Sequence, residues 1–163
     1  MKTASLKEIK TELGHATNKE LMDLCLRLAK SKKENKELLT YILFESHDET
    51  AYIENLKTRT RNEFEAINTQ NFHYIKKSIR KILRELKKYI RYSQNKETEV
   101  ELLINFCQEL SDFKPSTIKN GTLLNLYSRQ IELIRKRISV LHEDLQYDYA
   151  IELEKLLEKQ TKL

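Results

Sequence analysis

Apolar residues recur along most of this chain every three or four positions, the spacing that gathers them on one face of a helix. Short polar segments interrupt the pattern and divide it into eight stretches. The stretches predict helices over residues 6–13, 18–30, 36–43, 49–67, 72–92, 98–110, 124–141 and 145–159. Because short connections favour antiparallel neighbours, we expect about eight antiparallel helices, arranged as a helical bundle or as a short stack of helix hairpins.

The starts of several helices are marked by capping residues. Ser5 with Glu8 and Thr17 with Glu20 have the spacing of a capping box, in which each side chain accepts a hydrogen bond from the other residue's backbone N–H. Asp48 has the side chain of a typical N-cap. These local signals fix the expected first residues of three helices.

Two of the expected helices have unusual patterns. The middle of the fourth, residues 57–63, is wholly polar, which predicts an exposed or distorted segment. The seventh carries a heptad seam, typical of a helix that packs lengthwise on its neighbours and also compatible with dimerisation. The seam consists of Leu124, Tyr127, Ile131, Ile134, Ile138 and Leu141.

Composition strengthens the helical interpretation. Two glycines and one proline among 163 residues leave few of the turns that a sheet protein needs, and 34% charged residues suit solvated helix faces. The length suits one domain, residues 1–163. The segment 111–121, which holds Pro115 and Gly121, is the candidate sub-boundary. The sequence therefore predicts a single all-α domain.

The cysteines and the apolar runs bear on the cellular compartment. Cys25 and Cys107 both fall on apolar stripes, which predicts buried, inert thiols. The first 14 residues lack the apolar core of a signal peptide. The longest nearly apolar run, residues 38–44, is far too short to be a transmembrane segment. We therefore expect a cytoplasmic protein.

No catalytic or metal-binding pattern emerges from the sequence. The four histidines are dispersed and form no paired ligand motif, and the glycine content cannot supply a phosphate-binding loop. The carboxylates are spaced as exposed partners of lysine and arginine on helix faces. We expect no catalytic residues, no metal, no cofactor and no enzymatic activity.

The sharpest feature of the sequence is a cluster of eight cations within the fifth expected helix. They are Lys76, Lys77, Arg80, Lys81, Arg84, Lys87, Lys88 and Arg91. With Glu85 as the single anion, residues 76–91 carry +7, so the rest of a chain of net charge +5 carries −2. We take these eight residues as the candidate site for an anionic partner.

Several interpretations of this basic helix compete. Carboxylates of other helices can neutralise it, since 24 acidic residues lie outside the segment. It can bind an acidic protein partner or an anionic membrane. It can also contact the phosphates of a nucleic acid, with Tyr89 and Tyr92 stacking on bases. We expect a non-enzymatic helical scaffold or protein–protein interaction domain, with nucleic-acid binding as the alternative.

Several segments resemble a family of small all-helical bacterial proteins known as a domain of unknown function. The similar segments are 5–10, 17–24, 36–39, 75–89 and 146–149. The resemblance implies an all-helical fold and a bacterial origin, and it implies no activity.

The last expected hairpin has a second, local resemblance. Residues 144–153 resemble the helix-hairpin interaction module of nucleotide-excision-repair proteins and some chaperone adaptors. That resemblance implies a protein–protein contact. An aromatic wedge of Tyr147 and Tyr149 between two helices explains the same residues.

Overall fold

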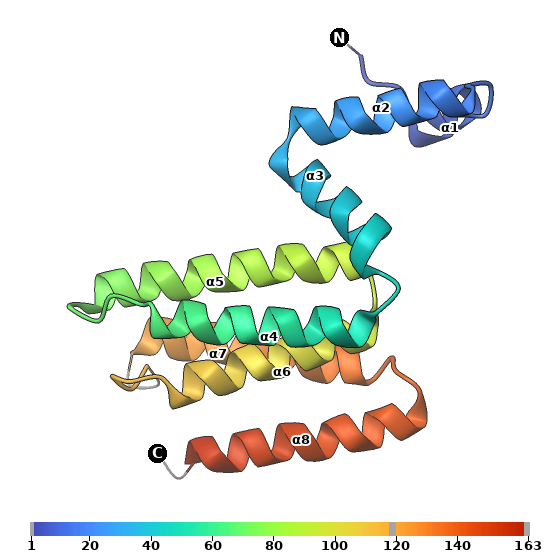
Figure 1. Cartoon of the computed structure of the whole chain (residues 1–163). Coiled ribbons are helices and arrows are strands. Elements are labelled where there is room, and N and C mark those ends of the chain that lie inside the picture. The colour runs from blue at the N-terminus through green and yellow to red at the C-terminus, as the bar shows by residue number, and fades with distance from the viewer. Residues whose placement is uncertain (1, 118–119, 162–163) are drawn as a thin grey trace. The chain divides into compact units, whose positions relative to one another are not determined.

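A computed structural model describes residues 2–117 and 120–161 of the chain. The described residues form eight α-helices and one π-helical turn and contain no strand, which confirms the all-α prediction (Figure 1). The helices are α1 (Leu6–Leu13), α2 (Asn18–Ser31), α3 (Lys33–Thr40), α4 (Glu49–Glu65), α5 (Phe72–Ser93), α6 (Lys96–Asp112), α7 (Gly121–Ile138) and α8 (Glu143–Thr161). The π-helical turn, η1 (Tyr41–Glu45), follows α3 directly. None of the described helices is long and apolar enough to cross a membrane.

The capping residues act as their spacing predicts. The Ser5 backbone N–H donates to Glu8 Oε2 over 2.7 Å, and the Glu8 N–H donates back to Ser5 Oγ over 3.3 Å. Thr17 and Glu20 repeat the arrangement at 2.8 and 3.3 Å. Asp48 caps α4 through its side chain. Each cap satisfies donors that a helix start otherwise leaves unpaired.

Several predicted boundaries are wrong. The seventh helix spans Gly121–Ile138 rather than residues 124–141, because the Asn120 side chain accepts hydrogen bonds from the Thr122 and Leu123 N–H groups and caps its start. The fourth helix ends at Glu65 rather than at residue 67.

The expected polar break over residues 31–35 shrinks to Lys32, because its extended backbone alone separates α2 from α3. The sixth helix begins at Lys96 rather than near Thr98, because the Asn95 side chain accepts a hydrogen bond from the Glu97 N–H over 2.9 Å and acts as the N-cap.

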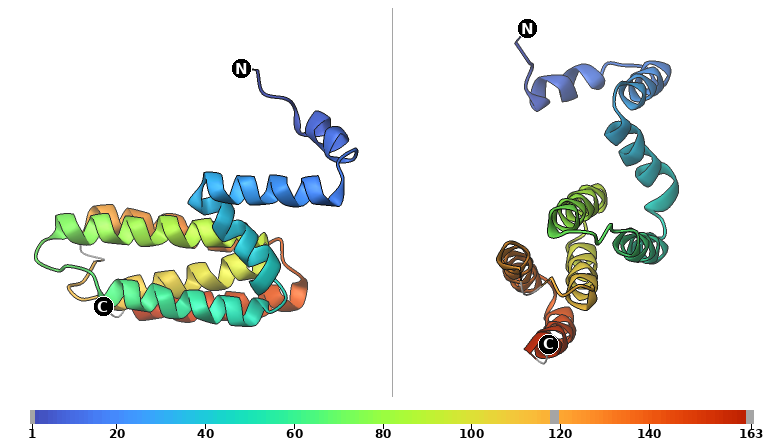
Figure 2. Two further views of the ribbon diagram at one scale, coloured as in Figure 1. Left: turned by 45° about the horizontal axis from the view of Figure 1, so that its top comes forward. Right: turned by 90° about the vertical axis from the view of Figure 1, so that its left-hand side faces the viewer.

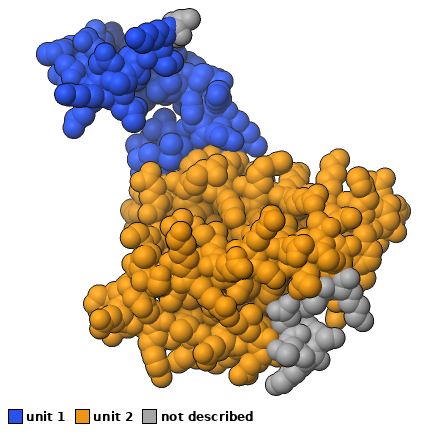
Figure 3. All heavy atoms as spheres, turned by 180° about the vertical axis from the view of Figure 1, so that it is seen from behind, with its two compact units in different colours: residues 1–44 blue, residues 45–163 orange. Residues whose placement is uncertain are grey.

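The chain divides into two compact units, coloured separately in Figure 3. Unit 1 is residues 1–44 and unit 2 is residues 45–163. The segment 111–121 therefore lies inside unit 2, and its residues 118–119 are outside the described part of the chain. Thr117 ties this segment to α6, since its Oγ1 donates to the Leu110 carbonyl over 2.8 Å.

Unit 1 lacks a buried apolar face. Neither α1, α2 nor α3 contains a buried residue, although α2 packs on α3. Leu24 and Leu28 lie with Cys25 on the apolar stripe of α2, and all three are exposed. The prediction of a buried thiol is therefore wrong for Cys25 and right for Cys107. Periodicity shows which face of a helix is apolar, but not whether another element covers it.

Unit 2 is a helical bundle built around α6. This helix packs against α4, α5, α7 and α8, and the right-hand view of Figure 2 shows it in the middle of the bundle. Apolar residues on most of its circumference suit a helix that is surrounded on all sides. The fully or almost fully buried ones are Val100, Leu102, Leu103, Ile104, Phe106, Cys107 and Leu110.

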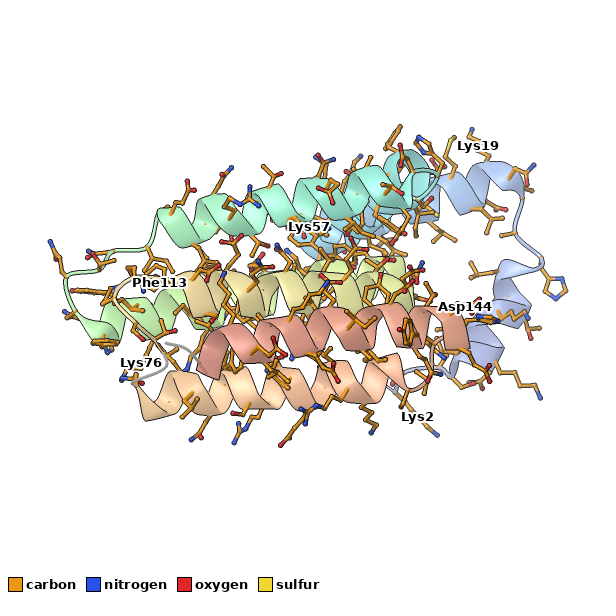
Figure 4. The ribbon with its side chains drawn as sticks, turned by 90° about the horizontal axis from the view of Figure 1, so that it is seen from below. Lys2, Lys19, Lys57, Lys76, Phe113 and Asp144 are labelled. Carbon is orange, nitrogen blue, oxygen red and sulfur yellow. The ribbon has the colours of Figure 1, made fainter. Side chains whose placement is uncertain are left out.

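The polar middle of α4 is neither distorted nor fully exposed. The helix is continuous from residue 49 to residue 65, and Thr60 is buried within the segment. Lys57, labelled in Figure 4, is half-buried and its Nζ lies 2.6 Å from Glu101 Oε1 on α6 and 2.8 Å from Glu54 Oε1. Because the charge is paired across the helix interface, a polar segment can face a neighbouring helix.

The last two helices bury most of their predicted stripes. In the α7 seam Tyr127, Ile131, Ile134 and Ile138 are buried. Leu124, at the start of the seam, stays partly exposed. The buried residues of α8 are Tyr149, Leu153 and Leu156. The described chain thus accommodates the α7 heptad seam within the bundle, where α7 packs on α6 and α8.

Candidate anion-binding surface

The eight candidate cations lie on α5, whose ends are set by local chemistry. The Asn71 side chain accepts hydrogen bonds from the His73 and Tyr74 backbone N–H groups over 2.9 and 3.1 Å and caps the start. The helix ends at Gln94, whose φ of 57° is left-handed and cannot continue a right-handed helix. Between these points, α5 has no glycine or proline to interrupt it.

The apolar face of α5 is buried as the sequence predicts. It packs on α4 and α6. The buried residues of this face are Ile75, Ile79, Ile82, Leu83, Leu86 and Ile90. The core contact holds the helix rigidly and turns its polar face away from the bundle, which fixes the direction of the cations near its start.

Five of the eight cations form a continuous row on this outward face, which we call the cation row. It consists of Lys76, Lys77, Arg80, Lys81 and Arg84. The row lines a surface hollow of about 430 Å³ together with His73. At 1.5 Å of rise per residue the row extends over about 12 Å. Figure 4 labels Lys76 at its first position.

The cation row has no ion pair within the described chain, although the charge of Glu85 lies close enough to Arg84 to interact with it. No carboxylate lines the hollow, and none of the five cations forms an ion pair with another described residue. Within the row, five pairs of cations lie three or four positions apart along the helix. Like-charge pairs at this spacing each destabilise a helix by about 0.2–0.5 kcal/mol, which amounts to about 1–2.5 kcal/mol for the row. A bound anion would relieve this repulsion.

The other three candidate cations lie outside the hollow. Lys88 is only 7% exposed, so it does not belong to the outward face. Its Nζ lies 3.0 Å from Glu85 Oε2 and 4.6 Å from the centroid of the Tyr89 ring. The hydrogen bond from Lys88 lowers the pKa of Glu85. This end of α5 is therefore neutralised in part by α5 itself.

Lys87 and Arg91 complete the eight. Lys87 is half-buried, and this burial lowers its pKa, although the charge of Glu99 on α6 opposes the shift. Arg91 is exposed, one turn beyond the neutralised segment. The structure thus brings five of the candidate residues together and separates three from them.

Aromatic side chains flank the cation row at its start rather than at its end. Phe72 and Tyr74 are exposed, and the rings of His73 and Tyr74 meet edge to face with centroids 5.8 Å apart. At the other end Tyr89 is half-buried, and its hydroxyl accepts a hydrogen bond from Arg59 Nη1 over 2.7 Å. Tyr89 and Tyr92, the residues expected to stack on bases, are both half-buried, and their rings meet edge to face with centroids 5.8 Å apart. Phe72 and Tyr74 were not expected there, although their place beside the N-cap indicates exposure.

No three histidine, cysteine or carboxylate side chains in residues 2–117 and 120–161 are grouped so as to hold an ion. Cys107 is buried, and burial raises the pKa of its thiol to about 12. A thiol in this state is a poor nucleophile.

The chain was compared with family models, curated proteins and solved structures, and none of the three comparisons gives a match. The resemblance to the helical bacterial family and to the excision-repair module therefore stays a prediction. In the last hairpin Tyr149 is buried and its hydroxyl donates to Glu97 Oε1 over 3.2 Å, whereas Tyr147 is 70% exposed. Only Tyr149 can act as a wedge between helices.

Proposed function

We propose that this protein is a non-enzymatic helical scaffold that binds an acidic segment of a partner protein through the cation row of α5. The observation that carries the proposal is the row itself. Five adjacent cations face outward, line one hollow and have no ion-pair partner among the described residues. Partners with complementary charge gain both association rate and specificity from such a surface.

The distribution of charge favours a local partner over a long polyanion. The residues outside 76–91 sum to −2, so the rest of the chain offers a longer polyanion no net positive charge. The five cations of the row are fewer than the roughly six to ten phosphate contacts of a nucleic-acid-binding protein with strongly salt-dependent affinity. A short acidic protein segment, about 12 Å long, matches the row in length and in charge.

Nucleic-acid binding is the second candidate because of the aromatic residues beside the row. Phe72 and Tyr74 are exposed next to the first cation, where bases of a single strand could stack while the phosphates follow the row. In this arrangement the nucleic-acid strand extends beyond the first residue of α5.

A titration with two defined probes tests both candidates. The probes are a fluorescent oligoglutamate peptide and a fluorescent single-stranded oligonucleotide, each measured by anisotropy at low and high salt. The row variant reverses four charges: Lys77→Glu, Arg80→Glu, Lys81→Glu and Arg84→Glu. The control variant reverses four exposed cations without ion pairs on α7 and α8: Arg129→Glu, Arg135→Glu, Lys136→Glu and Lys155→Glu.

We expect the wild type and the control variant to bind the peptide at low salt and the row variant to bind it at least tenfold more weakly. If the peptide binds the row variant and the control variant equally, or does not bind the wild type, the row is not the binding surface. If the oligonucleotide binds tightly while the peptide does not, and Phe72→Ala weakens it, the second candidate replaces the first.

A further inference from the structure

Unit 1 contains an apolar groove between α2 and its successor α3. The groove has a volume of about 240 Å³ and is lined by Cys25, Leu28 and Ala29 of α2, by Leu38 and Leu39 of α3, and by Ile42 of η1. Small-molecule pockets usually have volumes of about 300–1,000 Å³, so this groove suits inserted side chains better than a whole ligand.

Hydrogen bonds at the junction of the two helices stabilise the shape of the groove. Asn35 Nδ2 donates to the Leu28 carbonyl over 2.9 Å and to Ser31 Oγ over 3.3 Å, and Ser31 Oγ donates to the same carbonyl over 2.7 Å. These hydrogen bonds fix the angle between α2 and α3. The groove is therefore formed before any partner arrives, which reduces the entropy lost on binding.

Three of the apolar residues of the groove, Cys25, Leu28 and Ile42, are exposed, and the other three are partly exposed. Leu28 is 59% exposed and Ile42 is 52% exposed, and no residue of α1, α2 or α3 is buried. A unit of this size has little core of its own, so covering the groove removes apolar surface from water that the unit cannot cover itself.

The charges around the junction identify the partner. Residues 30–37 hold four lysines and two glutamates. Lys33 pairs with Glu37 at 3.6 Å, while Lys30, Lys32, Lys36 and Glu34 are exposed and form no ion pair with described residues, which leaves a net charge of +2. A second copy would place the same lysines against this rim and be repelled. A bilayer accepts protruding apolar side chains, whereas a concave groove needs side chains to enter it.

We infer that the α2–α3 groove binds an amphipathic helix of a partner protein, with leucine-type side chains on one face and carboxylates beside them. In this mode of recognition the apolar residues at positions i, i+3, i+4 and i+7 enter the groove, and the flanking carboxylates face Lys30, Lys32 and Lys36. The groove and the cation row share no residue, since the groove is lined by residues of unit 1 and the row by residues of unit 2.

The test uses three fluorescent helical peptides and the full-length chain. The first peptide carries leucine at i, i+3, i+4 and i+7 with glutamate at the flanking positions. The second has alanine in place of leucine, and the third has lysine in place of glutamate. Since the second peptide keeps all the carboxylates, any binding to the cation row affects the first and second peptides alike. The readout is the ratio of their affinities, measured by anisotropy.

We expect the leucine–glutamate peptide to bind at least tenfold more tightly than either of the other two. Leu28→Asp should abolish this preference. Leu26→Asp should keep it, because Leu26 is a similarly exposed leucine of the same helix, 47% exposed, that does not line the groove. The row variant with four reversed charges should also keep it, so the two proposals can fail separately.

Three results would overturn the inference. The first is the absence of a preference for the leucine–glutamate peptide, and the second is an equal loss of preference in both leucine variants. The third is a different occupant: self-association in sedimentation experiments, or binding to phosphatidylglycerol vesicles, that Leu28→Asp abolishes while no peptide binds. Circular dichroism of each variant confirms that its helices are intact.

Discussion

Removal of one cation from the middle of the row should make the protein more stable. Arg80 has three cations at helical neighbour spacing, Lys76, Lys77 and Arg84. The Arg80→Gln substitution removes these three like-charge pairs and keeps a residue of similar helix propensity. At about 0.2–0.5 kcal/mol for each pair, the free energy of unfolding should rise by about 0.6–1.5 kcal/mol at low ionic strength.

The effect should disappear as salt is added. Neighbouring cations on a helix are about 5–6 Å apart at Cβ. The Debye length falls from about 30 Å at 0.01 M to about 3 Å at 1 M ionic strength, so salt screens the repulsion. Thermal unfolding at both salt concentrations measures the stabilisation. In a chain of this size the unfolding midpoint rises by about 2–4 °C for each kcal/mol of added stability. Seven of the eight tyrosines lie in unit 2, so tyrosine fluorescence follows the relevant unit.

A paired cation provides the control. Lys57→Gln removes a half-buried cation that lies 2.6 Å from Glu101 Oε1, and it leaves that carboxylate without this ion pair. We expect Lys57→Gln to lower the midpoint at both salt concentrations. If Arg80→Gln also lowers the midpoint at low salt, or changes it equally at both concentrations, the row is not under electrostatic strain and the reasoning is wrong.

Three further results should follow from the packing and the titratable groups. Phe106→Ala should lower the free energy of unfolding by about 3–5 kcal/mol in urea titrations, because it empties a fully buried site at the centre of the bundle. A maleimide should modify the native protein once, at exposed Cys25, and react with Cys107 only after denaturation. Burial, with the charge of Glu101, raises the pKa of Glu152. Ionised Glu152 therefore destabilises the fold at pH values above this raised pKa, and the effect is absent below the unfolded carboxyl pKa of about 4.3. Glu152→Gln should therefore stabilise the protein at pH 7, and the difference from the wild type should shrink toward pH 4.

The sequence is a good guide to the helices because their signals are local. Ser5 and Thr17 need only the residue three positions later to form a capping box, and both boxes are present. The apolar stripe of α5 likewise depends on spacing alone, and it is buried throughout. Lys32 is a boundary that local signals do not predict. This one residue, in an extended conformation, separates α2 from α3 where a five-residue break was expected, and the propensity of lysine does not indicate an extended conformation there.

The candidate surface was predicted only in part, because neutralisation depends on distant residues. Lys77 and Lys88 look alike in the sequence, as both are lysines in a basic amphipathic helix. Lys77 is exposed, whereas Lys88 is buried against Glu85 and the Tyr89 ring. The groove of unit 1 was missed for a related reason, since the periodicity of Leu28 is that of a core residue whether or not a core is present.

The unpaired cations of α5 connect the stability of the protein with the binding of a ligand. The cation row destabilises the free protein by about 1–2.5 kcal/mol through repulsion among its members. A ligand that binds only the folded state stabilises it by about 2.7 kcal/mol at a concentration one hundred times its Kd. An anionic ligand on the row at that concentration therefore stabilises the folded state by an amount similar in size to the repulsion, and its binding should appear as a rise in the wild-type unfolding midpoint. Arg80→Gln should start from a higher midpoint and gain less, so the same substitution reports on both the repulsion and the ligand.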